Sequence, residues 1–90
     1  MIRFIMVLRA NPGKAASMVK HLRGLKSDRR VRILEKYIVF GKYDAALLLD
    51  CADSAHATEF ALRLASNDHC VTETFMATPI QDVRGNSRRR

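Results

Sequence analysis

The stretch YIVFGKYDAALLLDCAD, residues 37–53, decides the fold. A run of β-prone residues stops at residues 41–44 and resumes at once as an almost wholly apolar segment, which predicts two strands joined by a tight hairpin. Glycine tolerates unusual backbone angles and aspartate accepts hydrogen bonds from turn amides, so Gly41 and Asp44 fit a plain turn. Tyr43 lies in the same turn. The stretch can therefore be interpreted as hairpin chemistry or as one wall of a binding site.

The segments on either side alternate between strand and helix patterns. Apolar residues at helical spacing predict one helix within residues 13–27 and a second that begins after a cap at Asp53 or Ser54. Strand-like segments cover residues 2–10, 31–40, 45–51 and 70–78, and Pro79 ends the last of them. The order β-α-β-β-α-β predicts a ferredoxin-like α+β fold, with a four-stranded antiparallel sheet in the order 4-1-3-2 and two helices on one face.

Length and composition place this fold in one globular domain. The chain has 90 residues, of which 48% are hydrophobic and 28% are charged. We expect the module to span residues 1–79, with residues 80–90 forming a basic, disordered tail. No apolar run approaches the roughly 20 residues of a membrane helix. The N-terminal IRFIMVL is also too short for a secretory signal, so we expect a cytoplasmic protein with no membrane partner.

Both faces of the two central strands are apolar. In residues 2–10, Phe4 and Met6 alternate with Ile5 and Val7, and residues 45–51 show the same lack of polar alternation. Two helices cover only one face of a sheet, and soluble monomers avoid large exposed apolar patches. We therefore expect the second face to be buried against another copy of the chain, as a homodimer or a higher oligomer.

Cysteines and histidines do not show the spacing of a metal site or a redox pair. Cys51 and Cys70 are predicted to be free thiols, about 10 Å apart at one edge of the sheet and thus too far apart to bridge. His21, His56 and His69 are predicted to lie at the surface, without a metal or other cofactor.

Basic residues dominate the charge, and the formal net charge is +7. Eight of the sixteen basic residues lie within residues 20–42, and four more lie within residues 84–90. A basic surface attracts anions at long range, so binding of RNA or another polyanion through this stretch and the tail is one alternative function.

Four short motifs resemble a known family. NPGK at residues 11–14, VFGKYD at 39–44, ADS at 52–54 and CVTETFMAT at 70–78 are similar to the effector-binding, RAM-type module of the leucine-responsive regulator/AsnC transcription factors. The chain is also similar to the GYD family, named for a comparable Gly/Tyr/Asp motif. Both families belong to the dimeric α/β-barrel group.

The resemblance implies a homodimeric module for transcription regulation that binds a small molecule such as an amino acid. The regulators carry a helix-turn-helix before this module, whereas here the module starts at Met1. We therefore expect a stand-alone module without its own DNA-binding domain, for which a DNA-binding regulator paralogue is a candidate partner. A small dimeric α/β-barrel enzyme of the monooxygenase or isomerase type is a further alternative.

The expected ligand site consists of Gly41, Tyr43, Asp44, Thr72 and Thr74. In this hypothesis the Asp44 carboxylate binds a ligand ammonium group, and Tyr43 forms one wall of the pocket. The hydroxyl groups of Thr72 and Thr74 bind the ligand carboxylate. The residues that correspond to them in the regulators line an amino-acid site between subunits.

Overall fold

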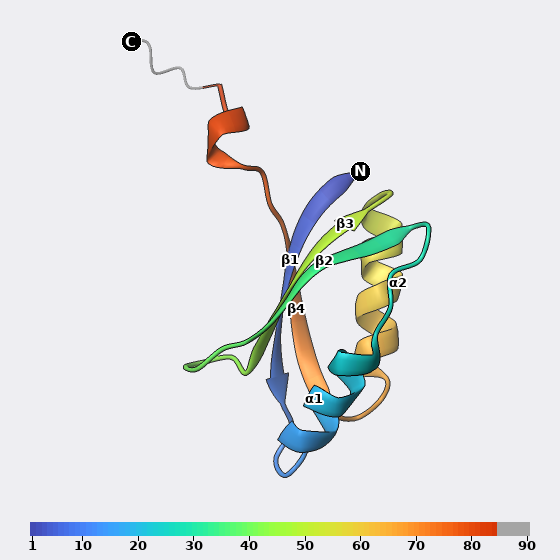
Figure 1. Cartoon of the computed structure of the whole chain (residues 1–90), viewed down its shortest axis with the longest axis vertical. Helices are drawn as coiled ribbons and strands as arrows, with labels where there is room; N and C mark the ends of the chain where they lie inside the picture. Colours follow the sequence, from blue (N-terminus) through green and yellow to red (C-terminus); the bar gives the residue numbers. More distant parts are fainter. Residues whose placement is uncertain (85–90) are drawn as a thin grey trace.

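Six elements follow one another in the order β-α-β-β-α-β, and a short 3-10 helix follows the last strand (Figure 1). The computed structural model describes residues 1–84. The elements are β1 (Ile2–Ala10), α1 (Ala15–Gly24), β2 (Val31–Ile38), β3 (Ala45–Cys51), α2 (Ser54–Ala65), β4 (Cys70–Met76) and η1 (Ile80–Asp82). Part of the predicted tail therefore forms η1, and residues 85–90 lie outside the described residues.

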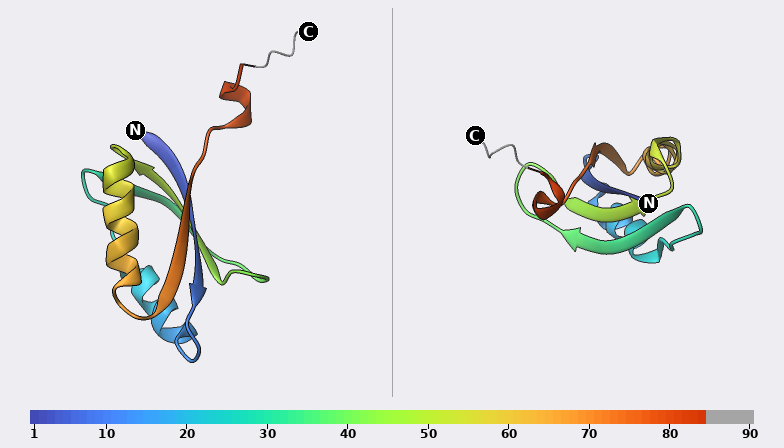
Figure 2. Two further views of the ribbon diagram at one scale, coloured as in Figure 1. Left: turned by 180° about the vertical axis from the view of Figure 1, so that it is seen from behind. Right: turned by 90° about the horizontal axis from the view of Figure 1, so that it is seen from above.

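The strands form one sheet in the order β2-β3-β1-β4, and all three neighbouring pairs are antiparallel. This is the predicted order 4-1-3-2 read from the other edge. Both helices lie on the same side of the sheet, and the β2–β3 hairpin projects away from them (Figures 1 and 2). The ferredoxin-like α+β fold is therefore confirmed. Within residues 1–84, no helix is long and apolar enough to cross a membrane.

Alternate residues of β1 and β3 form the sheet side of the hydrophobic core, facing the helices. Phe4, Met6 and Leu8 of β1 are buried together with Ala45, Leu47, Leu49 and Cys51 of β3. The buried residues of the helices pack against these side chains: Met18, Leu22, Ala57, Phe60 and Leu64. Each large apolar side chain buried in this way stabilises the fold by roughly 1.5–3 kcal/mol, so the helix-covered face carries most of the hydrophobic stabilisation.

The opposite face of the sheet has no cover within the described residues. Ile5 in the middle of β1 keeps 39% of its surface exposed, and its partner in β4, Phe75, keeps 50%. Leu48 of β3 pairs with Ile5 from the other side and is half-buried. We call this surface the open face.

A β-bulge in β2 was not predicted from the sequence. Ile33 pairs with Leu49 and Glu35 pairs with Leu48, so one extra residue lies in β2 between them. The shift brings Lys36 opposite Leu47, on the helix side, where its exposed side chain reaches the end of α1. Its Nζ donates hydrogen bonds to the carbonyls of Arg23 (3.3 Å) and Leu25 (2.7 Å). The bulge thus provides a cation for the C-terminal carbonyls of α1.

The two cysteines are free and buried, as predicted, and burial raises the pKa of each thiol. Their predicted separation was wrong. Cys51 pairs with Ile2 at the start of β1, whereas Cys70 pairs with Ala10 at its end. Because β3 and β4 both run antiparallel to β1, the end of one and the start of the other lie at opposite ends of the sheet. At about 3.3 Å per strand residue, the cysteines are roughly 26 Å apart along it.

Candidate functional site

The hairpin turn between β2 and β3 is held against the end of β1. Gly41 has a φ of +138°, a conformation that favours glycine. The backbone amide of Asp44 donates to the Leu8 carbonyl (2.8 Å), and its carbonyl accepts from the Val39 amide (3.0 Å). The turn therefore has a fixed position relative to the central strand.

The Asp44 carboxylate extends the pairing between β3 and β1. The regular ladder between these strands ends where Leu8 pairs with Ala45. Two residues further along β1, the Ala10 amide donates to Asp44 Oδ2 (2.8 Å), and Asp44 is half-buried. One carboxylate oxygen is thus occupied by a main-chain group. The geometry assigns Asp44 a role in holding the turn, the structural alternative raised by the sequence.

Tyr43 extends over the open face to the far edge of the sheet. Its hydroxyl donates a hydrogen bond to Glu73 Oε1 of β4, across the intervening strand β1. This bond is the main cause of the raised pKa of Tyr43, and the positive charge of Arg9 acts in the opposite direction. Arg9 lies two residues beyond Val7, the β1 partner of Glu73, and so shares the open face with it. Tyr43, Glu73 and Arg9 form a polar cluster at one end of this face, which we call the end cluster.

Thr72 and Thr74 lie on the other side of the sheet. They pair with Leu8 and Met6, whose side chains belong to the helix-covered core. Both threonines line a groove of about 510 Å³ between β4 and α2, and Thr74 Oγ1 is buried there without a hydrogen-bond partner. Within one protomer the sheet separates the two threonines from Tyr43, so the five predicted residues could meet only with the help of a second subunit, and the predicted site stays a prediction.

Sequence reasoning missed Glu73 and Arg9 as site residues. The sequence contained the necessary pattern. Strict alternation along β4 places Glu73 on the face of the sheet away from Thr72 and Thr74, which is the face of Ile5 and Val7. What the sequence did not show is the direction of the Tyr43 side chain, which leaves a turn and has no fixed alternation.

The open face is apolar in the middle and charged at its ends. At the end away from the end cluster, Arg3 Nε donates to Asp50 Oδ1 at 2.7 Å. The hydrogen bond from Arg3 is the main cause of the lowered pKa of Asp50. An apolar centre with a polar rim is the usual composition of a protein–protein interface.

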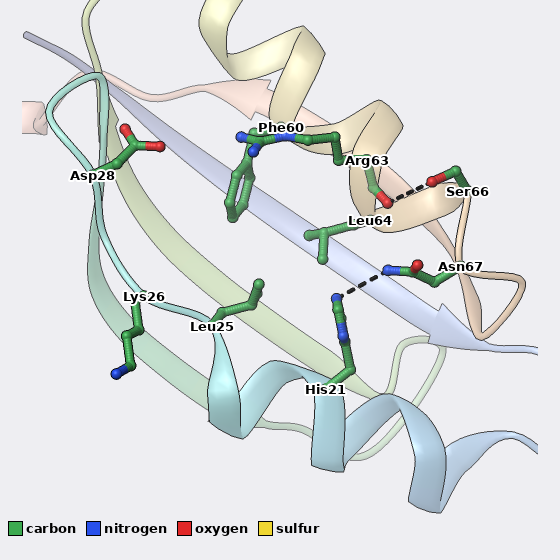
Figure 3. A pocket seen from close by; sticks show the side chains of 9 residues that line it. All are labelled: His21, Leu25, Lys26, Asp28, Phe60, Arg63, Leu64, Ser66 and Asn67. Atoms are coloured by element: carbon green, nitrogen blue, oxygen red, sulfur yellow. Dashed lines mark hydrogen bonds between the residues drawn. The ribbon is translucent and has the colours of Figure 1, made fainter.

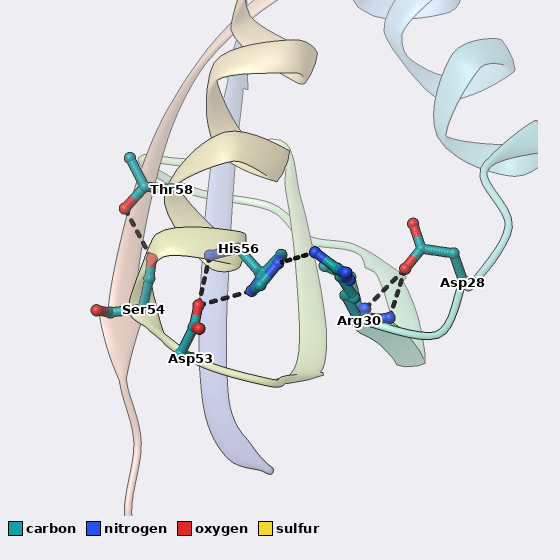
Figure 4. Close-up of polar contacts among 7 residues, drawn as sticks. Asp28, Arg30, Asp53, Ser54, His56 and Thr58 are labelled. Atoms are coloured by element: carbon teal, nitrogen blue, oxygen red, sulfur yellow. Dashed lines mark hydrogen bonds and ion pairs between the residues drawn. The ribbon is translucent and has the colours of Figure 1, made fainter.

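A second polar cluster joins the start of α2 to the loop before β2 (Figure 4). Asp53 caps α2 by accepting from the His56 amide (2.9 Å), and its Oδ1 lies 2.7 Å from His56 Nδ1. Arg30 Nη1 lies 2.8 Å from His56 Nε2. Since arginine can only donate, His56 accepts at Nε2 and carries its proton at Nδ1, toward Asp53. This arrangement holds the loop in place. Among residues 1–84, no group of three or more histidine, cysteine, aspartate or glutamate side chains could hold a metal ion.

Comparisons with known proteins agree with this fold. No family model matches the chain. It is 34% identical over 59 residues to the glutamine synthetase and cystathionine beta-lyase binding protein of Thermus thermophilus, and the match covers 66% of this chain and 62% of that relative.

Two solved structures relate the fold to regulators. FFRP-DM1 superposes with a TM-score of 0.69 at 18% identity, over 87% of this chain and all of that one. The leucine response regulatory protein LrpA of Mycobacterium tuberculosis superposes with a TM-score of 0.60 at 12% identity, over 87% of this chain and 51% of that regulator. The fold implied by the resemblance is confirmed: the chain has the same fold as FFRP-DM1 and as part of LrpA.

Proposed function

We propose that the chain is a self-associating regulatory module of the leucine-responsive regulator/AsnC type that binds a small amino-acid effector at the end cluster. The observation that carries this proposal is the hydrogen bond between Tyr43 and Glu73 across the open face, beside Arg9. It places groups of opposite charge next to an aromatic ring, at the rim of a surface that needs a partner.

Self-association follows from the open face. Ile5, Phe75 and Leu48 form a continuous apolar strip, because Ile5 pairs with both of the others. Covering this strip with a second copy removes apolar surface from water on both partners at once. A two-fold arrangement of sheet on sheet gives the dimeric α/β barrel expected from the family resemblance.

The end cluster suits a zwitterion. The Glu73 carboxylate can accept from a ligand ammonium group, and the Arg9 guanidinium can bind a ligand carboxylate through two parallel hydrogen bonds. Tyr43 supplies one wall, and Gly41 and Asp44 keep its turn in place. Because the cluster lies at the rim of the open face, a second copy would close over it and exclude water.

The test is a thermal-shift and calorimetric screen of the common amino acids with the full chain. We expect at least one of them to raise the melting temperature, since a ligand that binds the native state stabilises it. Glu73→Gln and Arg9→Gln should each weaken that ligand about tenfold or more, as expected for a lost charge-assisted hydrogen bond. Glu59→Gln on the exposed side of α2 is the matched control and should bind normally. If no amino acid stabilises the wild-type protein, this proposal is wrong.

A second candidate function is the binding of other proteins, which the name of the Thermus relative favours. Once the open face is covered, the helix layer remains exposed. It carries basic side chains, among them Lys20, Lys26 and Arg63, which suit an acidic enzyme surface. Purified glutamine synthetase should bind the chain more weakly at high salt. Lys26→Glu should weaken that binding while Lys42→Glu, on the hairpin, should not. Equal loss in both variants would refute a specific role for the helix layer.

A further inference from the structure

A separate groove lies between α1 and α2, on the side of the sheet away from the open face (Figure 3). Its volume is about 380 Å³, within the size range of small-molecule sites. Phe60 and Leu64 of α2 and Leu25 after α1 form its apolar lining. Phe60 and Leu64 are almost fully buried, so the lining belongs to the rigid core.

One end of this groove is closed by a polar contact. His21 of α1 points toward the loop after α2, and its Nε2 lies 3.0 Å from Asn67 Nδ2 (Figure 3). The amide must donate if this is a hydrogen bond, so His21 accepts at Nε2. The contact links the two helical segments at this end of the groove.

The other end carries the cation of Arg63. The hydrogen bond from the Arg30 amide is the main cause of the lowered pKa of Asp28, and the charge of Arg63 also helps to lower it. The Arg63 guanidinium carbon lies 5.7 Å from the centroid of the Phe60 ring. Among the described residues, the Arg63 side chain makes no hydrogen bond or ion pair. Asp28 faces it across the mouth, but Asp28 Oδ1 accepts from the amides of Arg30 (2.7 Å) and Val31 (2.9 Å). Lys26 adds a second positive charge to the lining.

We propose that this groove binds a small carboxylate with an apolar body. The body lies against Leu25, Phe60 and Leu64, and the carboxylate accepts hydrogen bonds from Arg63 at the mouth. Guanidinium and carboxylate match in charge and geometry, and the neighbouring aromatic ring holds the guanidinium plane. The groove is independent of the end cluster and stays accessible when the open face is covered, so the two sites can be occupied together.

The test is an NMR titration of the full chain with 4-methylpentanoate. Backbone shifts should saturate and map to Leu25, Phe60 and Leu64. The uncharged 4-methylpentanamide should bind about tenfold more weakly, because the charge-assisted hydrogen bond is lost. Arg63→Gln should weaken the binding of 4-methylpentanoate by a similar factor. Arg29→Gln, an exposed arginine in the adjacent loop, is the matched control and should bind as the wild type does.

Three results would overturn the inference. Shifts confined to Arg9, Tyr43 and Glu73 would show that the probe binds the end cluster instead. If acetate binds as tightly as 4-methylpentanoate, the probe is an adventitious surface ion only, since the apolar lining then contributes nothing to the affinity. Unchanged affinity of Arg63→Gln for the carboxylate would show that the Arg63 guanidinium does not bind the ligand. None of these outcomes depends on the amino-acid screen, so the two proposals can fail separately.

Discussion

Replacing Asp44 separates the two roles that the sequence allowed for it. Asp44→Ala removes the acceptor of the Ala10 amide, which then lies partly buried without a partner. An unsatisfied buried amide costs about 1–3 kcal/mol, so the free energy of unfolding should fall by that amount. Asp44→Asn keeps an oxygen in a similar position and should cost about 1 kcal/mol or less. For a domain of this size, each kcal/mol corresponds to a change of roughly 4–8 °C in melting temperature.

Urea denaturation at one fixed protein concentration measures these differences, and amide exchange gives a local readout. The Ala10 amide should exchange faster in Asp44→Ala than in the wild type, because its hydrogen bond is gone. Asp82→Ala, in the short helix after β4, is the control and should change neither quantity. If Asp44→Ala is as stable as the wild type and Asp44→Asn loses amino-acid binding, Asp44 is a ligand group and the assignment above is wrong.

Three further predictions concern groups whose surroundings the structure defines. Lys36→Met should lower the free energy of unfolding by up to about 1 kcal/mol in a denaturant titration, since the C-terminal carbonyls of α1 lose a charged donor at an exposed site. Lys20→Met should be neutral. Asp50 has a lowered pKa in the folded state, so its contribution to stability is present above the unfolded pKa near 3.9 and is lost as the pH falls through the folded pKa. The melting temperatures of the wild type and Asp50→Asn should therefore converge toward acid pH. A difference that stays constant with pH would refute this. Absorbance titration should show that the pKa of Tyr43 lies above the normal tyrosine pKa near 10, and Glu73→Gln should lower it. A Tyr43 pKa that is unchanged in Glu73→Gln would exclude the hydrogen bond in solution.

The sequence was sufficient for the strand order and for which face each residue of β1, β3 and β4 occupies. The strand order follows from the succession β-α-β-β-α-β, and the faces follow from two-residue alternation in regular strands, as with Phe4 and Met6 against Ile5 and Val7. The prediction failed where regular alternation does not apply. The bulge after Ile33 interrupts the alternation of β2, and no local residue pattern marks it.

The candidate site could be predicted only in part. The turn was located correctly, but Thr72 and Thr74 were grouped with Tyr43 on the basis of family resemblance, although their own alternation places them under α2. The partner of Tyr43 depends on a side chain that crosses β1 to reach Glu73, which is a long-range contact. Contacts of this kind depend on tertiary geometry and leave no periodic signal in the chain.

Sedimentation equilibrium of the wild type and Phe75→Ala tests the central claim, self-association through the open face, most directly. Phe75 is 50% exposed. Half of an aromatic side chain is about 100 Å², which at about 25 cal/mol per Å² gives roughly 2.5 kcal/mol for each copy and about 5 kcal/mol for a two-fold pair. We predict that the wild type is a dimer at micromolar concentration and that Phe75→Ala weakens it by roughly three to four orders of magnitude. Leu62→Ala, at an exposed residue on α2, should leave the dimer intact. A wild-type monomer at that concentration, or a Phe75→Ala variant that associates as tightly as the wild type, would contradict the claim.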